Sequence, residues 1–285
     1  MQFDQTTAQI FVPDGLPAHE ALARTTHMAI GAHQDDLEIM AIDGILACFG
    51  RRDRWFTGVV VTDGRGSPRA GLYGQYNDEE MRQVRIREQK KAAVLGEYAA
   101  QVLLDHPSAA VKDGRNRAPV DDIARLLAVA RPEVIYTHSL ADKHDTHVGV
   151  ALKVIEAFRS LPPRANGARP LRLYGCEVWR SLDWLVDADK VAFDCSAMDG
   201  LQMALLATFD SQVSGGKRYD LATMGRRRAN ATYHASHATD VTTGMQYGMD
   251  LTPLIEDPTL DPMSYLEGFL QRFVQDVRER IRKLR

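Results

Sequence analysis

Hydrophobic and polar positions follow two patterns in the first half of the chain. Short apolar runs rich in β-branched residues are typical of strands, and longer segments with helical spacing are typical of helices. The pattern predicts strands at residues 28–33, 55–62, 101–105 and 133–138, and helices at residues 37–49, 78–96, 120–130 and 146–158. Strands that are apolar along their whole length are buried on both faces, as in a parallel sheet. The sequence therefore predicts an α/β fold with a parallel sheet flanked by helices.

The second half is less regular. Residues 161–170 are rich in proline, glycine and arginine, which predicts a loop or linker, and a strand at 171–179 and a helix at 198–209 follow. Three consecutive arginines at 226–228 are expected mainly on a solvated helix face. Residues 265–284 repeat apolar positions at three and four residues, which predicts an amphipathic helix that docks its apolar stripe on the core.

The pattern shows no internal repeat and no clear domain boundary. We therefore expect one domain over residues 1–285, with its core at about 26–160. The irregular C-terminal half, residues 161–285, would supply packing and substrate-side elements. Whether the chain forms a homo-oligomer is left open.

Composition excludes several classes of protein. The 285 residues are 45% hydrophobic and 26% charged, which is ordinary for a globular protein. The net charge of −3 gives no general attraction to nucleic acid. No apolar run approaches the roughly 18 residues of a membrane span, and no signal peptide pattern is visible. The three cysteines, Cys48, Cys176 and Cys195, form no CxxC pair. We therefore expect a cytoplasmic protein without disulfides, nucleic-acid partners or a membrane span.

Two polar clusters follow two of the predicted strands. His33 and Asp36 come directly after the first strand, and His144 and His147 stand where the helix after strand 133–138 begins. Imidazole nitrogen and carboxylate oxygen are zinc donors, and a hydrolytic zinc site keeps three protein ligands and one open position. His33, Asp36 and one of the two later histidines would supply these ligands. Asp35 would then be free to accept a proton from the bound water.

Four further residues at or near the ends of predicted strands have less specific functional interpretations. Asp142 could orient a metal-bound histidine, and Asp63, which follows strand 55–62, could lie at the floor of the pocket or in an ordinary turn. His138 is expected to be a strand-end histidine satisfied by hydrogen bonds. Trp179 could stack on a sugar ring or belong to the core.

These segments resemble a known family. AHQDDLE, the later HDTH after VIYTH, the segment VRIREQKKAAVLG and the pair Ser211-Gln212 are similar to motifs of the PIG-L/LmbE-like de-N-acetylases, which include N-acetylglucosaminyl deacetylases. The resemblance covers roughly residues 28–158. It implies a Rossmann-like fold that holds one divalent metal ion per chain, usually zinc, although other divalent ions are accepted by similar donors.

The resemblance also assigns roles to individual residues. It implies a zinc-dependent amidohydrolase that removes the N-acetyl group from a small amino sugar or glycoconjugate. Asp35 would be the general base, and His144 would stabilise the oxyanion or protonate the leaving amine. The remaining roles are metal ligands, His33, Asp36 and His147, and substrate-side residues, Arg85, Gln212 and Asp63.

The chain departs from the family motifs at a few positions. Gln34 replaces a proline, Leu37 a glutamate, Thr146 an aspartate and Phe209 a histidine. Two alternatives therefore stay open: a metal-dependent hydrolase of another amide or ester, and a non-catalytic Rossmann-like module that binds a sugar or nucleotide. The absence of a GxGxxG motif counts against a dinucleotide site.

Overall fold

The computed structural model describes residues 1–162 and 171–285, so most of the predicted loop at 161–170 lies outside the described residues. The strands are β1 Gln9–Phe11, β2 His27–Gly31, β3 Phe56–Thr62, β4 Ala100–His106, β5 Val134–His138, β6 Arg172–Cys176, β7 Val191–Asp194 and β8 Met245–Asp250. The helices are α1 Ala18–Ala23, α2 Asp36–Met40, α3 Ile42–Cys48, α4 Asp78–Leu95, α5 Ser108–Lys112, α6 Ala118–Ala130, α7 Asp145–Ser160, α8 Asp199–Ala207, α9 Asp210–Val213, α10 Tyr219–Tyr233, α11 Pro253–Glu256 and α12 Pro262–Lys283.

The strands of the described residues form one eight-stranded sheet in the order β1-β4-β3-β2-β5-β6-β8-β7. The five strands from β4 to β6 are parallel, which the sequence predicts for the four of them in the first half, and β1, β8 and β7 are joined to their neighbours in antiparallel fashion. The sheet is therefore mixed. In the C-terminal half, β6, β8 and β7 extend the sheet at one side.

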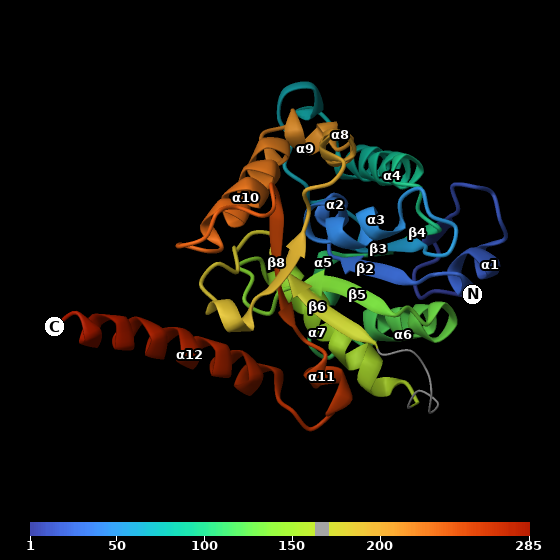
Figure 1. Ribbon diagram of the computed structural model, residues 1–285. Helices are drawn as coiled ribbons and strands as arrows, with labels where there is room; N and C mark the ends of the chain where they lie inside the picture. Colours follow the sequence, from blue (N-terminus) through green and yellow to red (C-terminus); the bar gives the residue numbers. More distant parts are fainter. Residues whose placement is uncertain (163–170) are drawn as a thin grey trace.

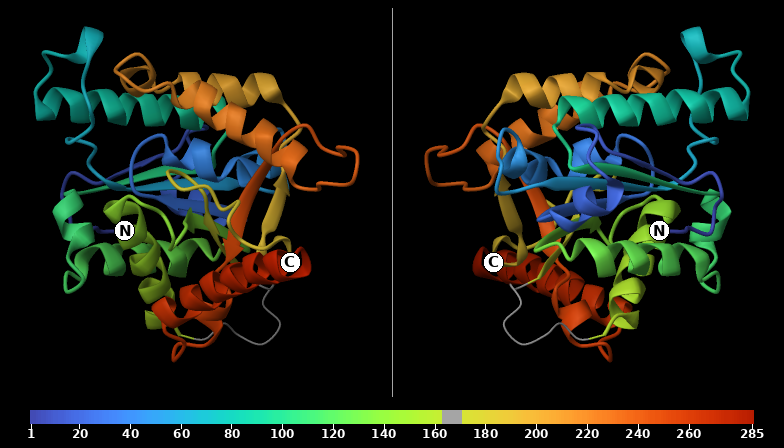
Figure 2. Two further views of the ribbon diagram at one scale, coloured as in Figure 1. Left: turned by 90° about the vertical axis from the view of Figure 1, so that its left-hand side faces the viewer. Right: turned by 90° about the vertical axis from the view of Figure 1, so that its right-hand side faces the viewer.

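Helices cover both faces of the sheet (Figures 1 and 2). The helices α2, α3, α4, α8 and α10 lie over one face, and α6 and α7 lie over the other. Each face has its own apolar cluster, one centred on α6 and α7 and the other on α2, α3 and α4. Every residue of β2 and β3 is buried, which explains their nearly continuous apolar sequence.

Two glycines let the start of α2 approach the sheet closely. The side chain of Leu37 is fully buried over Gly31 of β2 and Gly58 of β3. A Cβ atom at Gly31 would lie 2.9 Å from Leu37 Cδ2, and one at Gly58 would lie 2.8 Å from Leu37 Cδ1. The segment that carries Asp35 and Asp36 is therefore fixed at the end of β2 by packing.

The helix predicted at 37–49 is in fact two helices, α2 and α3, separated at Ala41. The break is stabilised by side chains from the C-terminal half. Arg227 donates to the carbonyls of Glu38 and Ile39, and Gln246 donates to those of Ile39 and Met40. Arg227 is therefore buried, which corrects the expectation of a solvated face.

Arg226 and Arg228 flank Arg227 in α10 and differ from it. Arg228 is exposed and pairs with Asp199, whereas Arg226 donates to the carbonyl of Val178. A solvated position is correct for Arg228 alone.

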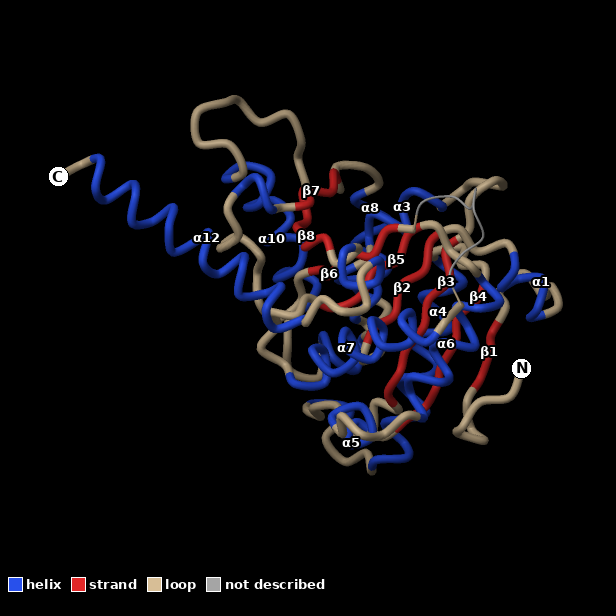
Figure 3. Tube along the Cα trace, turned by 90° about the horizontal axis from the view of Figure 1, so that it is seen from below, coloured by secondary structure: helices blue, strands red, loops and turns tan. Residues whose placement is uncertain are grey.

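The terminal helix α12 does not dock along its length on the core. It contacts the body over its first half, where Phe269 is buried, Arg272 pairs with Asp189 and the ring of Phe273 lies against that of Trp184. Its second half projects away from the body (Figures 1 and 3). Leu270, Phe273, Val274 and Val277 are 37–44% exposed. The docked apolar stripe expected from the sequence is therefore wrong for the second half of the helix. Among the described helices, α12 included, none combines the length and the apolar character required to cross a membrane.

Candidate metal and active site

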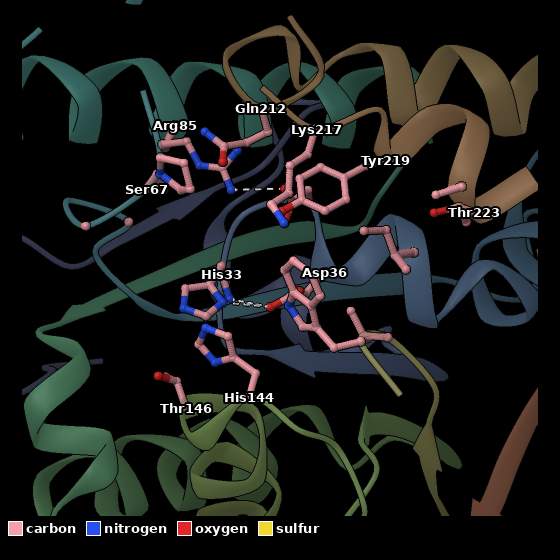
Figure 4. A pocket seen from close by; sticks show the side chains of 18 of the residues that line it. His33, Asp36, Ser67, Arg85, His144, Thr146, Gln212, Lys217, Tyr219 and Thr223 are labelled. Atoms are coloured by element: carbon pink, nitrogen blue, oxygen red, sulfur yellow. Dashed lines mark hydrogen bonds and ion pairs between the residues drawn. The ribbon is translucent and has the colours of Figure 1, made fainter. Parts of the chain in front are cut away.

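The two polar clusters meet because β2 and β5 are adjacent parallel strands. Their carboxyl ends lie at the same edge of the sheet, where ligands bind in open α/β folds. His33 and Asp36 follow β2, and His144 and His147 begin α7 after β5. A cavity of about 720 Å³ opens at this edge, with His33, Asp36 and His144 in its wall (Figure 4).

Three donor atoms form a compact triangle. His33 Nδ1 lies 3.2 Å from Asp36 Oδ2 and 3.2 Å from His147 Nε2, and His147 Nε2 lies 3.4 Å from Asp36 Oδ2. A tetrahedral ion with bonds of roughly 2.0–2.1 Å separates its donor atoms by about 3.3 Å. The triangle therefore fits a zinc-sized ion without rearrangement, with nitrogen and oxygen donors of the kind that zinc binds.

The charge states of these groups suit a cation. Burial by itself would raise the pKa of Asp36, but His147 and His138 nearby hold this pKa well below its usual range. Burial lowers the pKa of His147 to about 4, so its imidazole is neutral near pH 7. A carboxylate and a neutral imidazole are the protonation states that ligate a metal.

Asp142 fixes the orientation of His147. Its Oδ2 atom lies 3.3 Å from His147 Nδ1 and also accepts the backbone N–H of Trp179 at 3.2 Å. A carboxylate behind a ligating histidine sets the tautomer and leaves Nε2 free for the ion. The contact anticipated from the position of Asp142 in the sequence is thus present.

His138 belongs to a second group of metal-binding side chains, together with Asp142 and His147. Its Nε2 atom, however, accepts the backbone N–H of Ala32 at 2.8 Å, and the ring is fully buried. His138 is therefore a buried strand-end histidine that is hydrogen-bonded through Nε2, while its Nδ1 atom has no hydrogen-bond partner among the described residues. The group that reaches the cavity is the one containing His33.

Asp35 occupies a strained position beside the ligand triangle. Its φ of 96° lies in the left-handed region, which is unfavourable for residues other than glycine and is often found at active sites. Burial raises the pKa of Asp35 to about 6, while Arg85, whose Nη2 lies 3.3 Å from the carboxylate, opposes this effect. Asp35 is thus a carboxylate in the cavity wall whose pKa of about 6 suits a general base that acts near neutral pH.

His144 stands beside the triangle, at the N-terminal end of α7. Its ring centroid lies 5.0 Å from that of His33 and 4.6 Å from that of His147, and its ring is stacked at 6.4 Å on Trp179. Burial lowers the pKa of His144. The ring lines the cavity but is not one of the three candidate metal ligands, so it can exchange a proton with a bound molecule.

The structure brings most of the proposed site residues together. His33, Asp35, Asp36, Arg85, His144 and Gln212 line the cavity, and His147 lies directly behind them. Arg85 is further held by Glu88, which accepts hydrogen bonds from Ser211. Asp63 does not line the cavity, because its carboxylate turns to the backbone N–H and guanidinium of Arg65.

Several lining residues have no sequence signal of their own. Lys112, Lys217 and Tyr219 border the cavity and lie outside the motifs. Lys217 and Tyr219 point into it from the wall opposite His33 and His144 (Figure 4). Trp179 also lines it, and its place just beyond the carboxyl end of β6 was the one signal that linked it to the site.

Comparisons with solved structures show the same fold. N,N'-diacetylchitobiose deacetylase from Pyrococcus horikoshii matches at 15% identity over 85% of this chain and 88% of its own, with a TM-score of 0.59. The hydratase GalB from Pseudomonas putida KT2440, which acts on 4-carboxy-2-hydroxymuconate, matches at 16% identity over 80% and 96%, with a TM-score of 0.60. Teicoplanin deacetylase Orf2, in a zinc-inhibited form, matches at 14% identity over 79% and 97%, with a TM-score of 0.52.

One of the two sequence comparisons gives a family match, over part of the chain. A search of curated proteins gives no significant match. Residues 28–158, which carry β2 to α7 and all three atoms of the ligand triangle, match the family described as GlcNAc-PI de-N-acetylase, or PIG-L. The resemblance to the PIG-L family expected from the sequence is therefore confirmed over residues 28–158.

Proposed function

We propose that this chain is a metal-dependent hydrolase that removes the N-acetyl group from a small amino sugar or glycoconjugate and releases acetate. The observation that carries the proposal is the ligand triangle of His33, Asp36 and His147 with Asp35 and His144 beside it in one cavity. The PIG-L match and the deacetylases among the structural neighbours support it.

His33, Asp36 and His147 would hold one divalent ion, which we propose to be zinc. When bound, such an ion makes water more acidic and polarises a carbonyl oxygen. Iron and manganese accept similar donors and are the alternatives. A neighbour described in a zinc-inhibited form supports zinc binding in this fold and indicates that the zinc concentration must be controlled in assays.

The protein side chains would handle the protons. Asp35, which is largely ionised near pH 7, would accept a proton from the attacking water. Arg85 keeps this carboxylate ionised and oriented. His144 would stabilise the oxygen that becomes negative or deliver a proton to the leaving amine, whose bond to the acetyl carbon breaks. Gln212 and Arg85 would contact the rest of the substrate.

We also propose a cytoplasmic location and a small-molecule partner. Cys48, Cys176 and Cys195 are free and buried, which suits a reducing compartment. The cavity suits a ligand of sugar size.

A second candidate is the addition of water to an unsaturated carboxylate. The similarity to a hydratase and the basic cavity residues Lys112, Lys217 and Arg226 favour it. Asp35 would take a proton from water as oxygen bonds to one alkene carbon, and His144 would give a proton to the other. The two candidates use the same residues but give different products.

An acetate assay distinguishes them. We expect the zinc-loaded protein to release acetate from N-acetylglucosamine or an acidic derivative, to lose this activity after chelation and to regain it with one zinc ion per chain. Asp35→Asn should retain zinc and lose about 10²–10⁴-fold in kcat, whereas Asp53→Asn, at an exposed pair with Arg51, should change nothing. Loss of ultraviolet absorption from an unsaturated polycarboxylate, without acetate release from any N-acetyl or N-acyl compound, would establish the hydratase instead.

A further inference from the structure

The cavity is basic away from the ligand triangle. Its two acidic residues, Asp35 and Asp36, lie at the metal end, and Asp35 is already paired with Arg85. Lys112, Lys217, Arg218 and Arg226 line the remainder. Arg218 is paired with Asp220, whereas the other three have no carboxylate within ion-pair distance among the described residues. A concave surface with unneutralised charge of one sign attracts ligands of the opposite sign.

Two of these cations are held in place next to Trp179. Lys217 Nζ lies 4.7 Å from the ring centroid of Trp179, and Arg226 donates to the carbonyl of Val178, the residue before Trp179. Trp179 in turn stacks on His144. We call Lys217, Trp179 and Arg226 the basic wall.

We propose that the basic wall binds an anionic group of the substrate, a phosphate or a carboxylate, so that the substrate is an acidic N-acyl glycoconjugate. This inference rests on the proposed function, because it concerns the substrate of the same cavity. The sugar would lie between the two ends, with its N-acyl group at the ligand triangle and its acidic group at Lys217 and Arg226. Neutral sugars would lack the second contact.

Calorimetric binding to the metal-free protein tests the wall separately from the metal. The probes are N-acetylglucosamine, N-acetylglucosamine 1-phosphate and N-acetylmuramic acid, which carry no acidic group, a phosphate and a carboxylate. We expect at least one acidic sugar to bind about ten-fold more tightly than the neutral one, since two partly exposed charge contacts give about 1–2 kcal/mol. The tighter of the two acidic sugars identifies the anion.

Variants distinguish the wall from general electrostatic attraction. The double variant Lys217→Gln/Arg226→Gln should lose the preference, and Lys91→Gln, on the exposed side of α4, should keep it. Equal binding of neutral and acidic sugars by the unmodified protein, or a preference that survives in the double variant, would overturn the inference. If the preference holds while no sugar releases acetate, the deacetylase proposal fails and the anion site stands.

A separate observation concerns α12. Its apolar residues form a stripe whose spacing is the same when read from either end of the helix. Successive members of the stripe are three, four, three, one, three, four and three residues apart. Helical periodicity places these residues within a face about 100° wide. The stripe consists of Met263, Leu266, Leu270, Phe273, Val274, Val277, Ile281 and Leu284. Leu266 packs partly against the core, and the others are exposed.

The geometry points to a second copy of this chain as the partner, with the two α12 helices antiparallel. A two-fold axis between Phe273 and Val274 places Leu270 opposite Val277, so each apolar level meets an apolar level, as an interface between identical surfaces requires. Glu267 and Arg278 lie on one flank of the stripe, and this pairing brings them opposite each other. It also separates the two basic C-terminal ends.

Sedimentation of the full chain tests the pairing. We expect a reversible dimer that Val274→Glu/Val277→Glu converts to a monomer, whereas Gln275→Glu, off the stripe, leaves it intact. Glu267→Arg and Arg278→Glu should each weaken the dimer several-fold, and the two together should restore it. A chain that stays monomeric at all concentrations, including one whose α12 binds anionic lipid vesicles instead, would overturn the inference.

Discussion

The guanidinium of Arg85 lies 3.3 Å from the carboxylate of Asp35. Both side chains are almost completely buried at the wall of the cavity. Water therefore stabilises their charges very little, and each charge depends on the other for compensation. This ion pair links α4 to the segment after β2 and determines where the proposed base points.

Replacing Arg85 by glutamine should therefore lower kcat by about 10–100-fold without removing the metal, because the proposed base loses the partner that orients it. Steady-state kinetics and the zinc content of the purified protein check this expectation. Arg85→Lys should recover part of the rate, since it restores the charge. A glutamine variant with normal kcat would show that Asp35 does not depend on the pair.

Asp142→Asn should weaken zinc binding by about 10–100-fold, because Asn presents a neutral oxygen to His147. Competition with a zinc indicator measures the change. Asp121→Asn, which removes an exposed carboxylate paired with Arg117, is the matched control and should bind zinc as the unmodified chain does. Unchanged affinity in Asp142→Asn would remove Asp142 from the metal site.

His27 predicts a pH-dependent contribution to stability. Burial lowers the pKa of His27 from 6.5 to about 4 in the folded chain, so the unfolded chain binds the proton more readily. Stability should be complete above pH 6.5 and decrease as the pH falls toward 4, by at most about 3 kcal/mol from this residue. Urea unfolding of the unmodified chain and His27→Gln between pH 7 and 4.5 should give a shallower dependence for the variant; parallel curves would contradict the assignment.

Gly58→Ala should destabilise the fold by about 1–3 kcal/mol, because the added Cβ atom meets Leu37 and Gln101 at less than 3.0 Å. Gly225→Ala, at a helix position of α10 with open space around it, should instead stabilise by up to about 1 kcal/mol. Denaturant unfolding measures both. A Gly58→Ala chain as stable as the unmodified one would mean that α2 can move away from the sheet.

The parts of the structure that depend on the local sequence pattern could be predicted. Central strands such as β3 and the motif residues from His33 to Asp36 follow from burial on both faces and from the position of polar residues at strand ends. The break at Ala41 was not accessible, because it depends on Arg227 and Gln246, which lie far away along the chain.

The remaining differences have the same physical origin. An amphipathic stripe such as that of α12 states that an apolar face exists but not which surface covers it. Lys112 and Lys217 reach the cavity from loops and helix ends, where no periodicity marks a side chain as facing inward. Asp63 could be read as a pocket residue or a turn residue, and its contact with Arg65 depends on the loop conformation.

The carbonyls at the end of α2 have a consequence for how the protein can be divided. Their donors, Arg227 and Gln246, come from beyond residue 158, where the family match stops. A recombinant fragment truncated at that boundary would leave buried acceptors with no donor, at a cost of roughly 1–3 kcal/mol each. We therefore do not expect the region matched by the family to fold on its own. Truncations intended for crystallisation should retain β8 and α10.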